Sequence, residues 1–409
     1  MTEDSIVVIG AGLAGGKAVE AARDQGFTGR VTLISEESHL PYERPPLSKE
    51  YLAGKKERSA FDVHGADWYS EHDIDVRLGT SVTAIDTAAH QVQLDDGSTV
   101  SYGKLLLATG STPRKLTIPG ATADGVLYLR SVEDSDLLKR TIAEISRLVV
   151  IGGGWIGLEI TAAARNAGVE VTVLEAAKLP LLAVLGSEVA QVFADLHTAH
   201  GVDLRCGVQV AEITTDAGKA NGVRLADGTV IEADAVVVGI GAIPNTELAS
   251  AAGLTVSNGV TVDASLRTND PDIFAAGDIA NAFHPVLNQQ VRVEHWANAL
   301  NQPQVAVAGM LGQTAVYERL PYFYTDQYDL SMEYLGYVEP KSYDQVLFRG
   351  DVATREFIAF WLSEGRVLAG MNANVWDVSD AIGALILSRA VIDPKHLTDP
   401  TIPLTELAG

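Results

Sequence analysis

The sequence predicts an α/β protein in which two similar βαβ domains precede a C-terminal α+β domain. Three observations lead to this fold class. A glycine-rich turn between an apolar strand and a helical stretch occurs twice, at Gly10–Gly15 and at Gly152–Gly157. Each turn is followed by a second strand that ends in a glutamate. The last part of the chain alternates apolar and polar residues, which is typical of antiparallel strands.

The first glycine-rich turn has the spacing of a dinucleotide-binding fingerprint. The strand Ser5–Ile9 runs into Gly10–Gly15, and a helical stretch follows from Gly16 to Gln25. A second strand, Val31–Ser35, leads to Glu36. In this motif the first glycine makes the turn, the second admits a pyrophosphate to the helix N-terminus, and the third lets the helix pack on the strand. Glu36 is therefore expected to bind the hydroxyls of an adenosine ribose.

The second turn repeats this order of elements. The strand Arg147–Ile151 leads into Gly152–Gly157, and a helix is expected to about Ala167. The strand Glu170–Leu174 then ends at Glu175. One such motif is weak evidence, but two copies that each have strand, helix and acid correctly spaced predict two Rossmann-like dinucleotide-binding domains.

The duplication extends beyond the two fingerprints. Asp96-Gly97 and Asp227-Gly228 both lie between alternating runs, as hairpin turns do. Further on, one apolar strand ends at Gly110 and another ends at Gly241, with the same separation as the two hairpin turns. Two dinucleotide sites in one chain suggest a tightly held flavin that accepts hydride and a diffusible nicotinamide that delivers it.

Composition excludes several classes of function. Thirty Lys and Arg stand against 53 Asp and Glu, and the net charge of −23 disfavours a nucleic-acid partner. No apolar run reaches the roughly 18 residues of a membrane span, and the polar, acidic start at Met1–Ser5 is unlike a signal peptide. Cys206 is the only cysteine, so we expect neither a disulfide framework nor a thiolate metal site. We expect no metal, no membrane association and a cytoplasmic location.

With these motifs the chain resembles the FAD-dependent pyridine-nucleotide oxidoreductases over essentially its whole length. Within that family it resembles the ferredoxin reductases of oxygenase systems, those of the putidaredoxin-reductase type and of aromatic-ring dioxygenases. The motifs that carry the resemblance are Gly10–Gly15, Arg44–Lys49, Ala108–Gly110, Gly152–Glu159, Ala276–Asp278, Glu294–Ala299 and Phe323–Tyr328.

The resemblance implies a division into three domains. It assigns residues 1–110 and 245–325 to an FAD-binding domain and residues 111–244 to an inserted NAD-binding domain. Residues 326–409 would form a C-terminal interface domain. Its alternating runs predict strands at Tyr343–Phe348, Phe357–Leu362 and Val367–Asn372, and a helix at Val378–Ala390.

The resemblance also implies roles for particular residues. Lys49 would lie beside the flavin N5 edge with Glu159 as its carboxylate partner, where a cation favours the electron-rich reduced flavin. Trp296 would cover the isoalloxazine ring, and Asp278 would bind the ribityl chain. The alternatives are a solvated surface pair for Lys49 and Glu159 and an ordinary core tryptophan for Trp296. A helix N-cap at Asp278 would be compatible with its binding the ribityl chain.

The remaining cofactor-binding residues that the resemblance implies are Gly10, Gly12, Leu13, Ala14, Arg44, Val82, Ala108, Thr109, Gly110, Arg130, Gly277, Glu294, Gly152, Gly154, Ile156, Gly157 and Gly241.

The sequence departs from the family pattern in two places. The family usually places arginines just after Glu175, whereas this chain has Ala176–Lys178, which puts contacts to the adenosine end of NADH in doubt. Tyr324 stands where a tryptophan is common.

The absence of cysteine beside the flavin decides the type of electron acceptor. Leu40–Tyr51, the segment that could hold a redox-active thiol, contains none, so electrons must leave to an external partner. The expected partner is a [2Fe–2S] ferredoxin that serves a cytochrome P450 or a ring-hydroxylating oxygenase. Because such ferredoxins are usually acidic, a local basic patch is needed, and Arg292 is its leading candidate.

Other readings stay open. One is another NADH-driven flavoenzyme, such as a quinone or monodehydroascorbate reductase or a nitrite-reductase component. A redox signalling flavoprotein that resembles apoptosis-inducing factors is another. A flavin monooxygenase is disfavoured because its additional motif between the two fingerprints is missing. We expect a monomer or a weak dimer.

Overall fold

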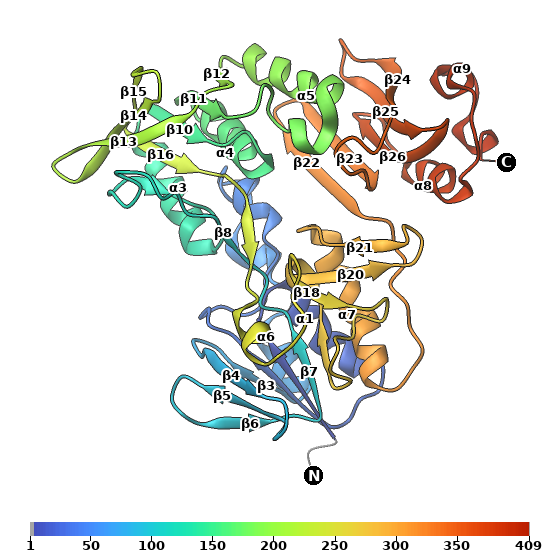
Figure 1. The fold of residues 1–409 in the computed structure, drawn as a ribbon. Helices are drawn as coiled ribbons and strands as arrows, with labels where there is room; N and C mark the ends of the chain where they lie inside the picture. The colour runs from blue at the N-terminus through green and yellow to red at the C-terminus, as the bar shows by residue number, and fades with distance from the viewer. Residues whose placement is uncertain (1–3, 409) are drawn as a thin grey trace. The chain divides into compact units, whose positions relative to one another are not determined.

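The computed structural model describes residues 4–408, and the described chain divides into two compact units (Figure 1). The first unit comprises the segment that ends at Arg44, together with Glu57–Thr112 and Ile243–Pro321. The second comprises Pro45–Lys56, Pro113–Ala242 and the chain from Tyr322 onward. The division into three domains made from the sequence stays a prediction.

A five-stranded parallel sheet forms the centre of the first unit. Its strand order is β19-β7-β1-β2-β3, and every neighbouring pair is parallel. The strand Ile6–Ile9 is fully buried, because a parallel sheet is covered on both faces. Helix α1 packs against α7 (Figure 1). The bounds are β1 Ser5–Ile9, α1 Leu13–Asp24, β2 Arg30–Ile34, β3 Ile74–Arg77, β7 Lys104–Leu107, β19 Ile273–Ala275 and α7 Trp296–Met310.

Two small sheets and several short helices complete the first unit. The antiparallel sheet β4-β5-β6 contains the hairpin that was predicted at Asp96-Gly97. The bounds are η2 Arg58–Phe61, α2 Ala66–Glu71, β4 Val82–Asp86, β5 Gln91–Leu94, β6 Thr99–Ser101, α6 Glu247–Ala251, β18 Val260–Val262, η3 Gly277–Ile279, β20 Ala280–His284 and β21 Gln289–Val291. Two of the boundaries between the units fall within β8, Ser111–Pro113, and β17, Ala242–Pro244.

The second unit contains a parallel sheet with the corresponding strand order, β12-β11-β10-β16-β9. The predicted turn at Asp227-Gly228 joins β14 to β15 in an antiparallel sheet. Gly97 and Gly228 both have a positive φ, as do Gly110 and Gly241, so the predicted duplication is confirmed in the backbone. The bounds are η1 Pro45–Ser48, β9 Val126–Leu127, α3 Val132–Glu144, β10 Arg147–Ile151, α4 Trp155–Asn166, β11 Glu170–Glu175, α5 Leu182–Ala199, β12 Asp203–Cys206, β13 Val210–Asp216, β14 Lys219–Leu225, β15 Val230–Glu232 and β16 Ala235–Val238.

The C-terminal part of the second unit is an antiparallel sheet with the order β22-β23-β26-β25-β24. The predicted strands and helix are confirmed with shifts of one to three residues at their ends. The sheet packs against α5, where Trp361 donates a hydrogen bond of 3.0 Å to the carbonyl oxygen of Leu185. The bounds are β22 Tyr322–Gln327, β23 Leu330–Gly336, β24 Gln345–Asp351, β25 Glu356–Ser363, β26 Arg366–Ala373, α8 Ser379–Ser388, α9 Pro394–Thr398 and η4 Leu404–Glu406.

Among residues 4–408, none of the helices has both the length and the apolar character that crossing a bilayer requires.

Candidate active site

The first fingerprint forms a turn that only glycine fits, with open space in front of it. A Cβ on Gly10 would lie 2.2 Å from the carbonyl oxygen of Ala108, and a Cβ on Gly15 would lie 1.9 Å from the carbonyl oxygen of Gly10. Around Gly12, by contrast, no atom lies within 4 Å of the position a Cβ would take. Helix α1 begins at Leu13, three residues before the predicted start, because the last glycines of the turn are already helical.

The start of α1 is suited to an anion. Gly12 is its N-cap and offers no side-chain oxygen, and the first turn contains no acidic residue. Backbone N–H groups at a helix N-terminus carry a partial positive charge and can donate hydrogen bonds to phosphate oxygens. The residues present therefore fit the pyrophosphate of a dinucleotide such as FAD.

Asp278 stands beside this turn in the first unit. It accepts a hydrogen bond of 2.8 Å from Ser111 Oγ and lies inside η3, so it is not the N-cap of that helix. The neighbouring Gly277 has φ +81°, and a Cβ there would come within 3.0 Å of the Ala14 side chain. The structure thus brings the Ala276–Asp278 motif against the first fingerprint.

The residues after β7 are fixed by one asparagine. Asn245 donates from its side chain to the carbonyl oxygen of Thr109 at 2.8 Å, and its backbone N–H donates to that of Gly110 at 3.0 Å. Thr109 Oγ1 in turn donates to the Asn245 carbonyl oxygen at 2.9 Å. No sequence motif had singled out Asn245, since its partners lie far away along the chain.

Arg44 is held in a charged cluster of the first unit. It donates to Glu37 Oε1 at 2.5 Å and to Tyr42 Oη at 3.0 Å. Burial alone would lower the pKa of Arg44, but Tyr42, Glu37 and Asp278 outweigh it and raise that pKa. Glu36, the predicted ribose ligand, is exposed beyond the end of β2.

The prediction of a basic docking patch at Arg292 is wrong. Its side chain is only 10 % exposed, and it pairs with Glu294 at 2.7 Å. It also donates to the Asp278 carbonyl oxygen at 3.2 Å. A guanidinium that is buried and neutralised in this way braces the Asp278 segment and presents no free charge to a partner. Trp296 follows nearby as the first residue of α7, and it is half-buried.

The second fingerprint repeats the geometry of the first. A Cβ on Gly152 would lie 2.3 Å from the Gly239 carbonyl oxygen, and one on Gly157 would lie 2.2 Å from that of Gly152. Gly154 has its nearest neighbour at 3.8 Å and caps α4 without a side-chain oxygen. Ile156 lies exposed on the first turn of α4.

Glu175 reaches the second fingerprint directly. Its carboxylate accepts hydrogen bonds from the N–H groups of Gly153 at 2.6 Å and Ala177 at 2.7 Å. A carboxylate at the end of β11 and against the glycine turn is placed to accept ribose hydroxyls and to repel a 2′-phosphate. The second site therefore fits NADH.

Lys49 and Glu159 form a buried ion pair within the second unit. Lys49 Nζ lies 2.7 Å from Glu159 Oε1, and the two side chains are 10 % and 2 % exposed. Glu159 also accepts hydrogen bonds from Ser48 Oγ at 2.5 Å and from Thr325 Oγ1 at 2.6 Å. The alternative of a solvated surface pair is wrong. Sequence reasoning missed Ser48 and the role of Thr325, although both belong to motifs that had been recognised.

Above Lys49 lies an aromatic ring from β22. The Lys49 ammonium lies 5.5 Å from the ring centroid of Tyr324. An aromatic face at this distance stabilises a cation, so Tyr324 helps to hold the Lys49 ammonium.

The other predicted residues lie as follows. Val82 begins β4 and is half-buried, and Ala108 is buried just after β7. Arg130 precedes α3 in the second unit, where its N–H donates to Asp134 at 2.8 Å. Gly241 has φ +99°, and its carbonyl oxygen accepts from Arg114 N–H at 2.8 Å.

The single thiol is poorly suited to redox chemistry. Cys206 ends β12, half-buried and opposite Glu175 in the sheet register. Burial, reinforced by the Glu175 carboxylate, raises the pKa of this thiol. Less of it is therefore the reactive thiolate.

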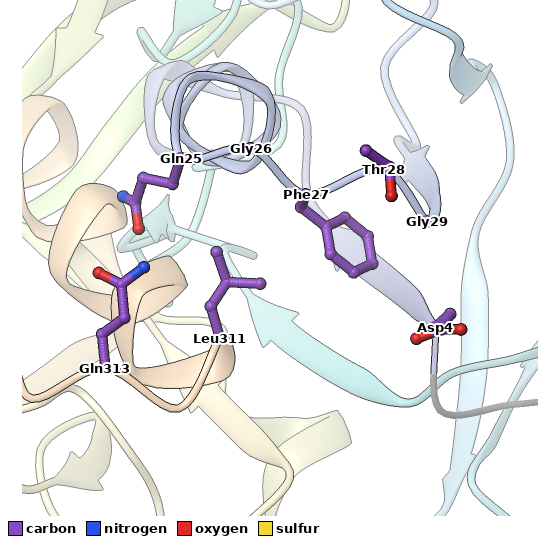
Figure 2. Close-up of a pocket in the computed structure, with 8 residues that line it drawn as sticks. All are labelled: Asp4, Gln25, Gly26, Phe27, Thr28, Gly29, Leu311 and Gln313. Atoms are coloured by element: carbon purple, nitrogen blue, oxygen red, sulfur yellow. The ribbon is translucent and has the colours of Figure 1, made fainter.

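A surface pocket of about 440 Å³ lies elsewhere in the first unit (Figure 2). It is formed by Asp4 just before β1, the turn after α1 at Gln25–Gly29, and Leu311 and Gln313 after α7. Ligands of parallel α/β sheets bind at the carboxyl ends of the strands, whereas this pocket lies at the amino end of β1. None of the predicted site residues lines it.

Comparison with known proteins agrees with this geometry. Residues 4–303 match the family described as pyridine nucleotide-disulphide oxidoreductase, and residues 322–408 match a reductase C-terminal domain. The chain is 38 % identical to putidaredoxin reductase of Pseudomonas putida, with 99 % of this chain and 96 % of that protein covered. It is 41 % identical to the ferredoxin–NAD(+) reductase component of an anthranilate 1,2-dioxygenase system from Burkholderia cepacia, with 99 % of each covered.

A solved structure is similar over the whole chain. The reductase in a covalent putidaredoxin reductase–putidaredoxin complex superposes with a TM-score of 0.94 at 37 % identity, covering 99 % of this chain and 98 % of that one. The two fingerprints, the buried Lys49–Glu159 pair and these full-length matches lead to one conclusion. The chain belongs to the pyridine nucleotide-disulphide oxidoreductase family, as an FAD- and NADH-dependent oxidoreductase with a reductase C-terminal domain.

Proposed function

We propose that this protein is an NADH-dependent ferredoxin reductase that supplies electrons to a [2Fe–2S] ferredoxin of a cytochrome P450 or ring-hydroxylating oxygenase. The observation that carries the proposal is the match along 99 % of the chain to relatives named as reductases of such systems. The single Cys206, whose raised pKa disfavours the reactive thiolate, agrees with it, because one cysteine forms no intramolecular disulfide that could accept the electrons.

The residues of this protein would bind FAD and NADH at two separate sites. Bound FAD would accept hydride from NADH and release electrons singly to the ferredoxin. The Gly10–Gly15 turn and the start of α1 would hold the FAD pyrophosphate, with Asp278 at the ribityl chain. The Gly152–Gly157 turn and Glu175 would hold NADH. Lys49, paired with Glu159, would supply the cation that favours reduced flavin.

We further propose a cytoplasmic location. Only one cysteine occurs in the sequence, so no intramolecular disulfide supports the fold, which suits a reducing compartment where NADH is present.

The function is tested by reduction of cytochrome c with NADH, with and without a candidate [2Fe–2S] ferredoxin. We expect the ferredoxin to increase the rate many-fold, because it relays electrons that the flavoprotein passes slowly to cytochrome c. A rate that is the same with and without each of several ferredoxins, while NADH still reduces quinones or ferricyanide, would point to a small-molecule acceptor.

The contacts of Glu175 predict the choice of nicotinamide. We expect NADH to be preferred over NADPH by at least about tenfold in kcat/KM, or about 1.4 kcal/mol, because the carboxylate repels the 2′-phosphate. Steady-state kinetics with ferricyanide measure this preference. Glu175→Ala should reduce the ratio of the two kcat/KM values, mainly because NADH binds more weakly. Lys178 would then be available to bind the 2′-phosphate of NADPH. Equal use of both nucleotides by the unaltered protein would contradict the role assigned to Glu175.

A further inference from the structure

A chain of buried hydrogen bonds leads from Glu159 into the C-terminal part of the second unit. Thr325 and Gln327 lie on β22 and His197 lies on α5, and each is at most 1 % exposed. Thr325 Oγ1 is 2.6 Å from Glu159 Oε1, and Gln327 Nε2 is 3.2 Å from Thr325 Oγ1. His197 Nε2 is 2.8 Å from Gln327 Oε1. These hydrogen bonds therefore connect Glu159 of α4 to three side chains of α5 and β22, which lie outside the second glycine-rich turn.

The single hydroxyl proton of Thr325 fixes the direction of every bond in this chain. An ionised Glu159 only accepts, so Thr325 must donate its proton to it. Thr325 can then only accept from Gln327, which turns the amide NH₂ toward Thr325 and the amide oxygen toward His197. The oxygen in turn requires a proton on His197 Nε2. All donors therefore point toward the carboxylate.

His197 is suited to end the chain as a neutral ring. Burial lowers the pKa of His197 to about 4, although its bond to Gln327 opposes this shift. With the proton on Nε2, its Nδ1 is an acceptor, and the hydroxyl of Tyr328 lies 3.4 Å away. An amide in the middle does not relay protons as a row of hydroxyls does, so the chain orients groups and does not conduct protons.

We propose that Thr325, Gln327 and His197 are positioning residues for flavin reduction. They hold the Glu159 carboxylate in one orientation, and Glu159 holds the Lys49 ammonium in place. A hydrogen bond donated to a buried carboxylate fixes the position of its oxygens, and donors that polarise one another strengthen that bond. This inference rests on the proposed function, in which Lys49 serves the flavin.

The test compares Thr325→Val with Thr325→Ser in the FAD-loaded protein. Valine keeps the volume and removes both hydrogen bonds, while serine keeps the hydroxyl. Stopped-flow mixing with NADH should show flavin reduction about tenfold slower in Thr325→Val, as the loss of one bond to a charged group predicts, with the Kd of NADH nearly unchanged. Thr325→Ser should stay close to the unaltered rate. A folded, flavin-loaded Thr325→Val that is reduced at the unaltered rate would overturn the proposal.

A double variant separates positioning from general stability. If Thr325 acts through Lys49, adding Thr325→Val to Lys49→Met should slow reduction no further. If instead the two effects multiply, Thr325 acts independently of Lys49 and the proposal is wrong.

The His197 end of this series of hydrogen bonds offers a matched pair of variants that does not depend on Thr325. His197→Gln keeps an N–H donor for Gln327 and should be reduced at nearly the unaltered rate, while His197→Leu should be slower by about threefold. Equal rates in the two variants would exclude a role for His197. None of these measurements contains a ferredoxin, so a failure of the proposed partner would leave them unaffected. Failure of NADH to reduce the flavin of the unaltered protein would contradict the proposed function itself.

Discussion

Replacing Gly12 by alanine is expected to give a folded protein that no longer retains its flavin. No protein atom lies within 4 Å of the position the new Cβ would take, so the chain alone accommodates it. That open space is where the dinucleotide pyrophosphate would approach the start of α1. We expect FAD affinity to fall at least about 100-fold, or about 2.7 kcal/mol. Flavin absorbance after purification and titration of the apoprotein with FAD measure the effect.

Two control variants make this result specific. Gly154→Ala changes the equivalent position of the second fingerprint, so it should keep the flavin and raise the KM for NADH instead. Gly10→Ala should fail to fold well, because its Cβ would meet the Ala108 carbonyl oxygen at 2.2 Å and its φ is +105°. Loss of flavin from the Gly154→Ala protein, with retention in Gly12→Ala, would reverse the assignment of the two sites.

Replacing Lys49 by methionine should affect both activity and stability. Flavin reduction by NADH should slow by about 100-fold, the size expected for one charge interaction at intermediate dielectric. The flavin potential should fall as well, since the reduced form loses its nearby cation. The partner Glu159 would be left as a buried charge without its cation, which costs about 3 kcal/mol of unfolding free energy. Stopped-flow reduction and denaturant unfolding measure the two effects separately.

The double variant Lys49→Met with Glu159→Gln distinguishes these two effects. Removing the stranded carboxylate should restore most of the stability, while flavin reduction stays slow because the cation is still absent. Recovery of both stability and the rate of flavin reduction in the double variant would mean that Lys49 contributes only to folding. An unchanged rate of flavin reduction in Lys49→Met alone would mean that Lys49 has no role in this step.

The sequence predicted the fold well where structure depends on local pattern. Both fingerprints, both hairpin turns and the strands of the C-terminal sheet were located to within a few residues, since strand periodicity, glycine turns and hairpin dipeptides are signals of neighbouring residues. The largest error at a site element was the start of α1, placed at Gly16 and found at Leu13. Glycine is a poor helix former, so helix propensity does not indicate that the last glycines of such a turn already belong to the helix.

Contacts between distant segments were predicted less well. Ser48, Thr325 and Glu159 converge from three separate parts of the chain, and no spacing rule links them. Arg292 shows the same limit, because its charge is visible in the sequence but its pairing with Glu294 and its burial are not. The Lys49–Glu159 pair was anticipated only through the resemblance to a family, and the burial of that pair came from the structure.

The order in which the chain contributes to the two units has a consequence for synthesis on the ribosome. Strands β1, β2, β3 and β7 of the first sheet are translated first, but one of its edge strands, β19, is translated more than 160 residues after β7. Until Ile273–Ala275 emerges, the apolar strand Lys104–Leu107 lacks its second neighbour, and α1 lacks the helix that covers it. Unpaired apolar edges readily join other chains, so nascent chains that stall before residue 273 should depend most on chaperones. Asp278 follows that strand, and the nascent protein therefore acquires its complete flavin site only late in translation.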